Sequence, residues 1–162
     1  TGVGGAVWLN GKLYLGKYGR AGHLGHMSLD AGSLRSGITG IPGSLEDAIG
    51  NATVRHRTYG KYEDTKTLVE AFRSGEPLAT WAWLSSLHQL AVGTASLINV
   101  FSPEMVVLGG GVTSAGDALF GPLKTFMDIF EWRPSGSEVP IRRAHFDEWS
   151  GAVGAAAQFK NQ

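Results

Sequence analysis

Two glycine-rich segments hold most of the residues that are suited to binding a phosphorylated ligand. The first is Thr1-Gly2-Val3-Gly4-Gly5-Ala6, and the second, Gly109-Gly110-Gly111, follows an apolar run at residues 105–108. Glycine lets the backbone approach a phosphate group or a purine closely, and consecutive N–H groups in such a turn are donors for it. The two segments therefore predict a nucleotide site, to which Thr1, Gly2 and Gly4 contribute together with the three glycines at 109–111.

Each glycine segment also has an interpretation in which it binds nothing. Residues 1–6 fit the rim of a β-hairpin or a β-bulge, because a short glycine string alone is a weak motif. Residues 109–111 fit a turn that serves packing only. The second segment has the stronger support, since strand, turn and helix follow one another there in the order that places a ligand at the carboxyl end of a strand.

The loop at residues 16–26 carries His23 and His26, the densest cluster of polar chemistry in the chain. Two histidines fall short of the three or four ligands of a stable zinc site. Hydrogen bonds to a polyhydroxylated ligand suit them better, and a solvated surface is the alternative. Glu46 lies near a predicted helix start, where it either interacts with the helix dipole or accepts hydrogen bonds from sugar hydroxyls.

Composition excludes several classes of function. The 162 residues are 43% hydrophobic and include 24 glycines, and 14 basic and 14 acidic residues give zero net charge. This balance excludes a general attraction to nucleic acid or an anionic membrane, so Arg55-His56-Arg57 is interpreted as solvated surface. Without cysteine, disulfides and thiolate metal sites are excluded, and a reducing cytoplasm is compatible with the sequence. No stretch reaches the length of a membrane span.

Local signals in the first half of the chain predict a hairpin and then helices. Asn10-Gly11 between two β-prone runs predicts a hairpin, with strands at residues 6–9 and 12–15. A short strand is expected at residues 27–29. Ser44 predicts the start of a helix from residue 45 to about residue 57. Asp64 or Thr65 caps a further helix that ends at Gly75.

The second half is organised around a long helix from residue 78 to about residue 100. Its broad apolar stripe, which includes Trp81 and Leu87, makes it the expected spine of the domain. Residues 105–108 are predicted to form a buried strand, and a helix follows the glycine turn to about residue 130. Residues 139–144 read as an edge strand because proline removes a ladder donor. With a small-residue helix at 151–157, this order predicts an α/β fold.

Taken in order, these segments resemble the ROK family (repressors, open reading frames and sugar kinases), whose members have a two-lobed actin-like ATPase fold. Residues 1–6 are similar to the family's second phosphate loop, and residues 22–27 are similar to its Glu-x-Gly-His segment. Residues 102–112 are similar to the glycine turn on the adenosine side, and residues 151–156 to the closing helix. The resemblance runs from end to end and lies in the order and spacing of the motifs.

The resemblance implies a fold and an activity. It implies the C-terminal lobe of a ribonuclease H-like fold, a mixed sheet packed with helices, as a single domain over residues 1–162. We expect the other lobe to lie upstream, and the isolated piece to be inactive because the family's catalytic base, an Asp, belongs to that lobe. The implied activity is ATP-dependent phosphorylation of a hexose or an N-acetylhexosamine, with Mg²⁺, in a cytoplasmic homodimer.

The same resemblance implies roles for individual residues. His26 would contact the sugar, with His23 beside it, and Glu46 would bind the sugar hydroxyls. The nucleotide would be held by the glycine segments, which comprise Thr1, Gly2, Gly4, Gly109, Gly110 and Gly111. No catalytic residue is assigned within the chain.

Two departures from the family pattern affect these expectations. His23 stands where the family has a glutamate, so a group that can donate replaces an acceptor-only carboxylate. The family's cysteine-rich zinc segment reads Gly-Ile-Thr-Gly-Ile-Pro-Gly-Ser at residues 37–44, without a thiol. The resemblance therefore implies that the structural zinc is absent and that hydrogen bonds and packing hold this loop, with Pro42 stiffening it.

Two other functions remain open at this point. A sugar-sensing domain of a ROK repressor is the main rival to a kinase, and it would carry a DNA-binding segment upstream; nucleic acid is a partner only in that case. A degenerate paralogue with a structural or dimerising role is the third. The phosphate loop favours a kinase, and the altered sugar residues favour a sensor.

Overall fold

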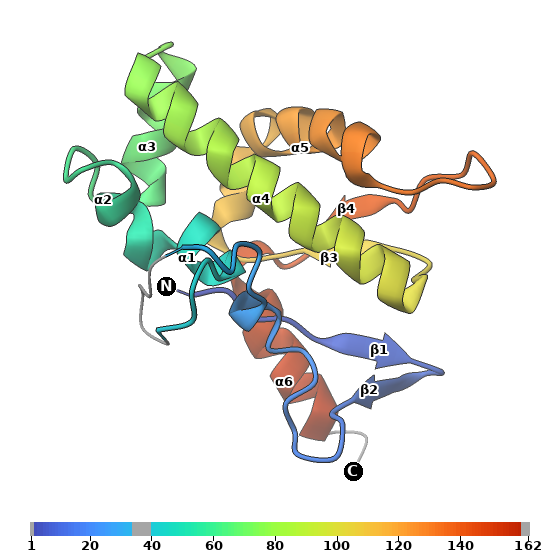
Figure 1. Cartoon of the computed structure of the whole chain (residues 1–162). Coiled ribbons are helices and arrows are strands. Elements are labelled where there is room, and N and C mark those ends of the chain that lie inside the picture. Colours follow the sequence, from blue (N-terminus) through green and yellow to red (C-terminus); the bar gives the residue numbers. More distant parts are fainter. Residues whose placement is uncertain (1, 34–39, 160–162) are drawn as a thin grey trace. The chain divides into compact units, whose positions relative to one another are not determined.

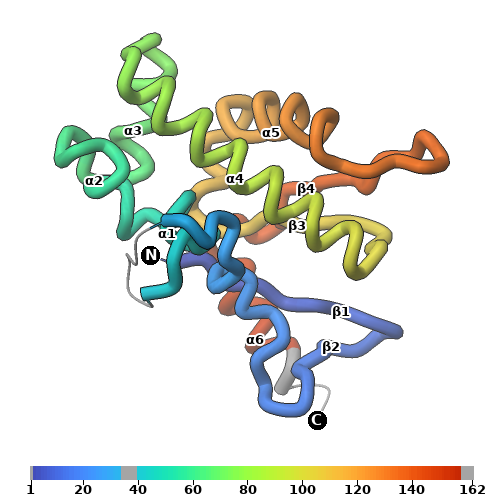
Figure 2. Tube along the Cα trace, in the orientation of Figure 1, coloured from blue at the N-terminus to red at the C-terminus, as the bar shows by residue number. Residues whose placement is uncertain are grey.

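The computed structural model describes residues 2–33 and 40–159. The chain divides into two compact units, Thr1–Gly93 and Thr94–Gln162, and each contains helices and a two-stranded sheet (Figures 1 and 2). The predicted α/β class is confirmed. The expected single domain over residues 1–162 stays a prediction, and the predicted site residue Thr1 lies outside the described residues.

The first unit begins with the predicted hairpin. β1 (Val7–Leu9) pairs antiparallel with β2 (Lys12–Tyr14). Asn10 and Gly11 both have positive φ, 51° and 74°. Positive φ at both turn residues gives a twist that matches the twist of the two strands, which explains why this dipeptide closes the hairpin.

The helix predicted over residues 45–57 is interrupted, so that prediction is wrong in its middle. α1 (Leu45–Ile49) begins at the expected cap, Ser44. Gly50 then adopts an extended conformation with ψ of 145°, and a Cβ there would lie 2.5 Å from the carbonyl oxygen of Glu46. The chain continues in two short elements, η2 (Asn51–Thr53) and α2 (Val54–Arg57).

Two further helices complete the first unit. α3 (Thr65–Arg73) begins at Asp64, whose carboxylate accepts the N–H of Thr67 at 2.8 Å, as the cap prediction requires. α4 (Pro77–Phe101) is the predicted long helix, and the division between the units falls inside it. The core contains the following buried side chains: Leu45, Ile49, Val54, Leu68, Val69, Ala79, Ala82, Trp83, Leu87, Leu90 and Ala91.

The second unit is built on a parallel strand pair. β3 (Val106–Leu108) pairs with β4 (Ile141–Arg143). In the described residues this pair is separate from the β1–β2 sheet, which differs from the single mixed sheet that the resemblance implies. Burial of β3 was also expected, but Val107 is 54% exposed. The remaining elements are η3 (Gly111–Ala115), α5 (Asp117–Phe130), η4 (Asp147–Trp149) and α6 (Ser150–Phe159).

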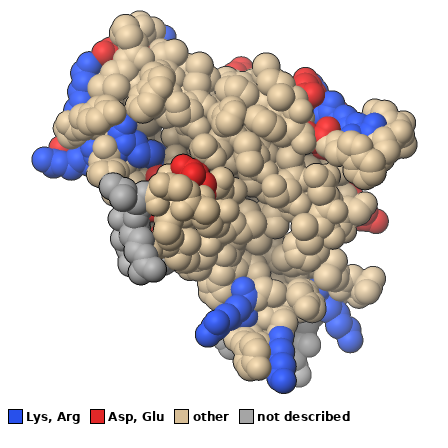
Figure 3. Space-filling model, viewed as in Figure 1, with Lys and Arg blue, Asp and Glu red and all other residues tan. Residues whose placement is uncertain are grey.

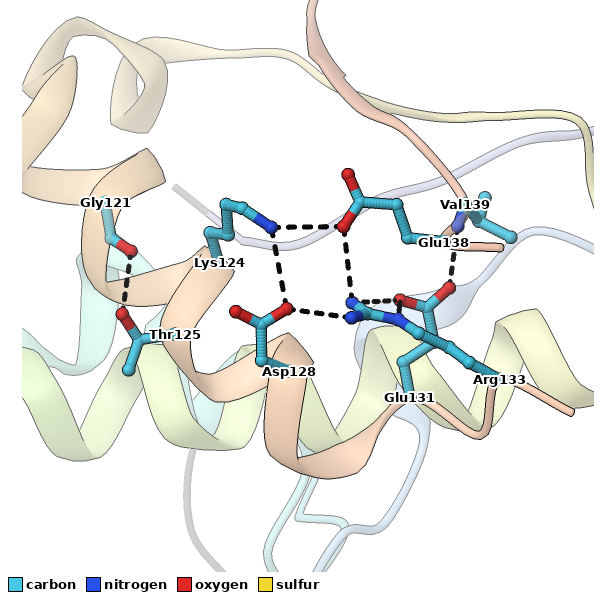
Figure 4. A network of polar contacts seen from close by, with 8 residues as sticks. All are labelled: Gly121, Lys124, Thr125, Asp128, Glu131, Arg133, Glu138 and Val139. Atoms are coloured by element: carbon cyan, nitrogen blue, oxygen red, sulfur yellow. Dashed lines mark hydrogen bonds and ion pairs between the residues drawn. The ribbon is translucent and has the colours of Figure 1, made fainter. Parts of the chain in front are cut away.

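A charged network ties α5 to the segment before β4 (Figure 4). Arg133 Nε and Nη2 lie 2.8 and 2.7 Å from Glu131 Oε2, and Arg133 Nη1 lies 2.9 Å from Asp128. Glu131 also accepts the N–H of Val139 at 2.7 Å, and its side chain is only 2% exposed. The buried carboxylate is therefore both paired with a cation and hydrogen-bonded. Lys124 and Glu138 complete the network.

Elsewhere the charged side chains are dispersed. On the face drawn in Figure 3, Lys and Arg form several separate groups with wide uncharged areas between them. This agrees with the zero net charge of the sequence. Within residues 2–33 and 40–159, no helix combines the length and the apolar character that crossing a membrane requires.

Candidate functional site

The first glycine segment, the histidine loop and Glu46 come together within the first unit. Val3 donates its N–H to Glu46 Oε2 at 2.8 Å, across 43 positions of sequence. The same segment packs on the loop, because a Cβ at Gly22 would lie 2.7 Å from the carbonyl oxygen of Gly5. A Cβ at Gly25 would lie closer still to the carbonyl oxygen of Val3 and would overlap it. Glycines in both segments thus permit backbone to touch backbone.

Glu46 lies in the first turn of α1 and faces the glycine segment. Oε2 of its carboxylate accepts the Val3 N–H, while Oε1 has no hydrogen-bond partner among the described residues. A Cβ at Gly2 would overlap the same carboxylate. The sequence left two roles open for Glu46, an interaction with the helix dipole or hydrogen bonds to sugar hydroxyls. The geometry adds a direct hydrogen bond to the segment that is predicted to hold phosphate.

The two histidines of the loop are neighbours with different surroundings. Their rings stack with centroids 5.8 Å apart and planes inclined by 20°. His23 is exposed and its Nδ1 lies 3.0 Å from the carbonyl oxygen of Arg20, so Nδ1 carries the proton and donates. His26 belongs to η1 (Leu24–His26) and is partly buried, and its Nδ1 has no hydrogen-bond partner among the described residues. The pair thus presents one anchored ring and one ring with spare bonding capacity.

The segment that replaces the family's cysteines is described only from residue 40, and its residues 37–39 lie outside the described part. Ser28 donates its hydroxyl to the carbonyl of Pro42 at 2.7 Å, and Leu29 donates its N–H to the carbonyl of Gly43 at 2.8 Å. Residues 27–29 do not form the expected strand; only an isolated bridge joins Ser28 to Ser44. Hydrogen bonds therefore hold the described end of this loop.

The residues present do not fit a structural zinc. The sequence has no cysteine. In the described ranges, no group of three or more His, Asp or Glu side chains is placed to hold a metal ion. Substoichiometric zinc in elemental analysis stays a prediction, and a full equivalent would contradict it.

The second glycine segment lies in the second unit and is already partly bonded. Gly110 has a φ of 89° and donates its N–H to the carbonyl of Asp147 at 3.1 Å. A Cβ at Gly109 would lie 3.3 Å from Ser150, at the start of α6, whereas Gly110 and Gly111 face open space. Packing explains Gly109, and the open side of the next two leaves room for a ligand. That this segment and residues 1–5 hold one nucleotide stays a prediction.

Arg57 supports the helix that carries Glu46, a contact that the sequence did not reveal. The sequence predicts a solvated side chain, but Arg57 is partly buried, with Nε and Nη2 shielded from solvent, and its Nη1 donates to the carbonyl of Ala48 at 2.8 Å. Burial lowers the pKa of Arg57 to about 10, an effect that the charge of Asp47 opposes, so the guanidinium stays protonated at neutral pH. A cation at the C-terminal end of a helix stabilises it. Arg57 thereby closes the end of α1 opposite to Ser44, and the helix that carries Glu46 is fixed at both ends.

A groove of about 870 Å³ lies next to Arg57, between the α1–α2 segment and α4. Arg55, Arg57, Tyr59 and Trp81 are among the residues that line it. His23, His26 and Glu46 do not line it. The groove and the predicted site are therefore separate features of the first unit.

Curated proteins with related sequences include sugar kinases. The chain is 32% identical to an N-acetylmannosamine kinase of Vibrio cholerae over 162 residues, which cover 99% of this chain and 55% of that protein. It is 34% identical to a glucokinase of Thermotoga maritima over 180 residues, which cover 100% of this chain and 56% of that protein. The chain spans about half the length of these relatives.

Solved structures that resemble this chain also include sugar kinases. A ROK hexokinase from Thermus thermophilus matches with a TM-score of 0.78 and 34% identity, over 98% of this chain and 54% of that one. A ROK glucokinase from Streptomyces griseus, in complex with glucose and AMPPNP, matches with a TM-score of 0.81 and 25% identity, over 98% of this chain and 57% of that one. The ROK family itself matches residues 1–162. The chain belongs to the ROK family.

Proposed function

We propose that this chain, as a member of the ROK family, supplies nucleotide- and sugar-binding residues of an ATP-dependent kinase for a hexose or an N-acetylhexosamine. The observation that carries the proposal is the convergence of the first glycine segment, His26 and Glu46 in one unit, linked by the Val3–Glu46 hydrogen bond of 2.8 Å. The identity to N-acetylmannosamine kinase and glucokinase supports the choice of substrates.

In this proposal each group has a positioning role. Phosphoryl transfer depends on placing the reactants and neutralising charge more than on covalent chemistry by the protein. The open side of Gly4, where a Cβ would meet no atom within 4 Å, receives the phosphates, and Mg²⁺ arrives with them. His26 and the unpartnered Oε1 of Glu46 bind sugar hydroxyls. The group that accepts the sugar's proton is not assigned to this chain.

Sugar-dependent release of ADP from ATP by the full-length protein tests the proposal. Glucose and N-acetylmannosamine are the first members of the sugar panel. We expect His26→Ala to lower kcat/KM by about tenfold or more, because a hydrogen bond to the sugar is lost. His56→Ala, which alters an exposed histidine on α2, is the matched control. Turnover that is absent with every sugar, or equal in parent and His26→Ala, contradicts the proposal.

A sugar sensor is the second candidate, and the exposed His23 is the observation that favours it. A ring that can donate replaces the acceptor-only carboxylate that the family resemblance implies at this position. A ROK transcriptional regulator also shares the fold, with a TM-score of 0.78 at 23% identity. Sugar binding measured by calorimetry, without any release of ADP, would favour the sensor over the kinase.

A further inference from the structure

We propose that Glu46 is a positioning residue for the nucleotide as well as a ligand of the sugar, so that it couples the two binding events. This inference rests on the proposed function. It goes further because it assigns to one carboxylate a role in both half-sites, and because it predicts that occupancy of one half-site changes the affinity of the other.

The first step is the division of labour between the two carboxylate oxygens. Oε2 is committed to the N–H of Val3 at 2.8 Å, and Oε1 has no partner among the described residues. Hydrogen bonds to an ionised acceptor are stronger than neutral ones. One oxygen therefore fixes the backbone of the glycine segment while the other remains free to bind a sugar hydroxyl.

The second step is the orientation of the glycine segment itself. The carboxylate of Glu46 leaves no room for a side chain at Gly2. The carbonyl group of Val3 likewise leaves no room for a side chain at Gly25 in the histidine loop. Gly4 has open space around its missing Cβ. The segment thus has one part clamped between α1 and the histidine loop, and one part that is open to the phosphates. Loss of the clamp would let the donors of the open part turn away.

The third step is that Glu46 itself is held in place. Ser44 accepts the N–H of Asp47 at 3.1 Å at the start of α1, and Arg57 donates to the carbonyl of Ala48 at 2.8 Å at its end. A helix of five residues is unstable without such support. Its caps therefore keep the carboxylate between the two half-sites, where a sugar that binds Oε1 also restricts the rotamer that holds Val3.

Nucleotide affinity measured in the absence of sugar separates this role from a sugar contact. Calorimetry with AMPPNP on the full-length protein is the readout. We expect Glu46→Ala to weaken AMPPNP binding about tenfold, the effect of losing one charge-assisted hydrogen bond. Glu46→Gln retains an oxygen that can accept the Val3 N–H, so its AMPPNP affinity should stay within about threefold of the parent. Both variants should lose affinity for the sugar.

Reciprocity provides a second readout. A saturating sugar should tighten AMPPNP binding in the parent, and AMPPNP should tighten sugar binding by the same factor, because the coupling free energy is shared. Glu46→Ala should abolish this factor. Glu63→Ala is the matched control, since Glu63 is an exposed carboxylate of the same unit that pairs with Arg55. It should change neither affinity.

Gly25→Ala keeps the inference testable if Glu46→Ala fails to fold. The added methyl group would overlap the Val3 carbonyl and displace the glycine segment from the histidine loop, while Glu46 stays unchanged. This variant should therefore also weaken AMPPNP binding. Unchanged AMPPNP affinity in Glu46→Ala, with weaker sugar binding, would overturn the coupling and leave the kinase proposal standing. Equal losses in Glu46→Ala and Glu46→Gln would overturn it as well. A parent protein that binds no AMPPNP would overturn both proposals.

Discussion

Two arginines, one in each unit, show two different ways of bonding a guanidinium group. Arg133 in the second unit contacts the carboxylates of Glu131, Asp128 and Glu138, and its hydrogen bonds to Glu131 first and then to Asp128 raise its pKa. Arg57 in the first unit bonds to the carbonyls around Ala48, and its Nε and Nη2 are buried without partners among the described residues. Carboxylates contact the Arg133 guanidinium directly, whereas Arg57 bonds to backbone carbonyls and is also acted on by the charge of Asp47.

The network around Arg133 stabilises the second unit, whereas Arg57 fixes the position of α1 in the first unit. The buried carboxylate of Glu131 is paired with Arg133 and also accepts the N–H of Val139, so its charge has partners on both oxygens. Burial disfavours the charged form of Arg57, the charge of Asp47 opposes this effect, and the hydrogen bond to the Ala48 carbonyl fixes the end of α1. That helix carries Glu46. Burial of the Arg57 charge therefore lowers the stability of the first unit at a place where the proposed binding residue must be held in position.

The largest effect is expected when the second unit's network is broken. Arg133→Met should lower the free energy of unfolding by about 3 kcal/mol, because it leaves the Glu131 carboxylate buried without a cation. Urea denaturation measures the loss. The control is Arg143→Met, which removes a half-exposed pair with Asp147 and should cost less than about 1 kcal/mol. Similar losses in both variants would show that burial of Glu131 is not decisive.

A smaller effect is expected at the other arginine. Arg57→Met removes a capping hydrogen bond to Ala48, but it also removes two buried N–H groups that have no partner among the described residues. These contributions oppose each other, so the free energy of unfolding should fall by about 1 kcal/mol or less. The same urea series measures it. A loss as large as that of Arg133→Met would remove the distinction between the two arginines.

The smallest effect depends on pH and concerns an exposed cluster of the first unit. Hydrogen bonds from Lys61 first, then from Tyr62 and the Ala79 N–H, lower the pKa of Glu76 from 4.5 to about 2. A carboxyl group whose pKa is lowered by folding stabilises the fold at pH values above its pKa in the unfolded chain. This stabilisation is lost as the pH falls through the pKa of the folded protein. The stability difference between parent and Glu76→Gln should therefore be complete at pH 7 and shrink between pH ~4.5 and ~2. A difference that is independent of pH in thermal unfolding would contradict this assignment.

Local signals in the sequence predicted the elements whose ends are set by neighbouring residues. Asn10-Gly11 closes the hairpin, and Asp64 caps α3, because turn twist and capping depend on two or three adjacent positions. The break at Gly50 was missed, since the glycine follows a helical pattern and its extended conformation depends on contact with Glu46. The order of strand, turn and helix around residues 109–111 was also correct.

The face that a helix buries was harder to predict. α4 is apolar around most of its circumference, so spacing placed Trp81 on the buried stripe, and this prediction is wrong. Trp83 is fully buried and Trp81 is 55% exposed. When several faces are apolar, the neighbours that pack against the helix decide which one becomes the core.

Sequence alone determined the family and the α/β class, and it proposed the candidate binding residues, because motif order and residue type can be read along the chain. Tertiary structure decided how those residues meet. Only folding brings the Val3 N–H to Glu46 across 43 positions and partly buries Arg57 in a run that the sequence predicts to be solvated. The physical reason is that a hydrogen bond between distant segments depends on the path of the chain between them, which no spacing rule records.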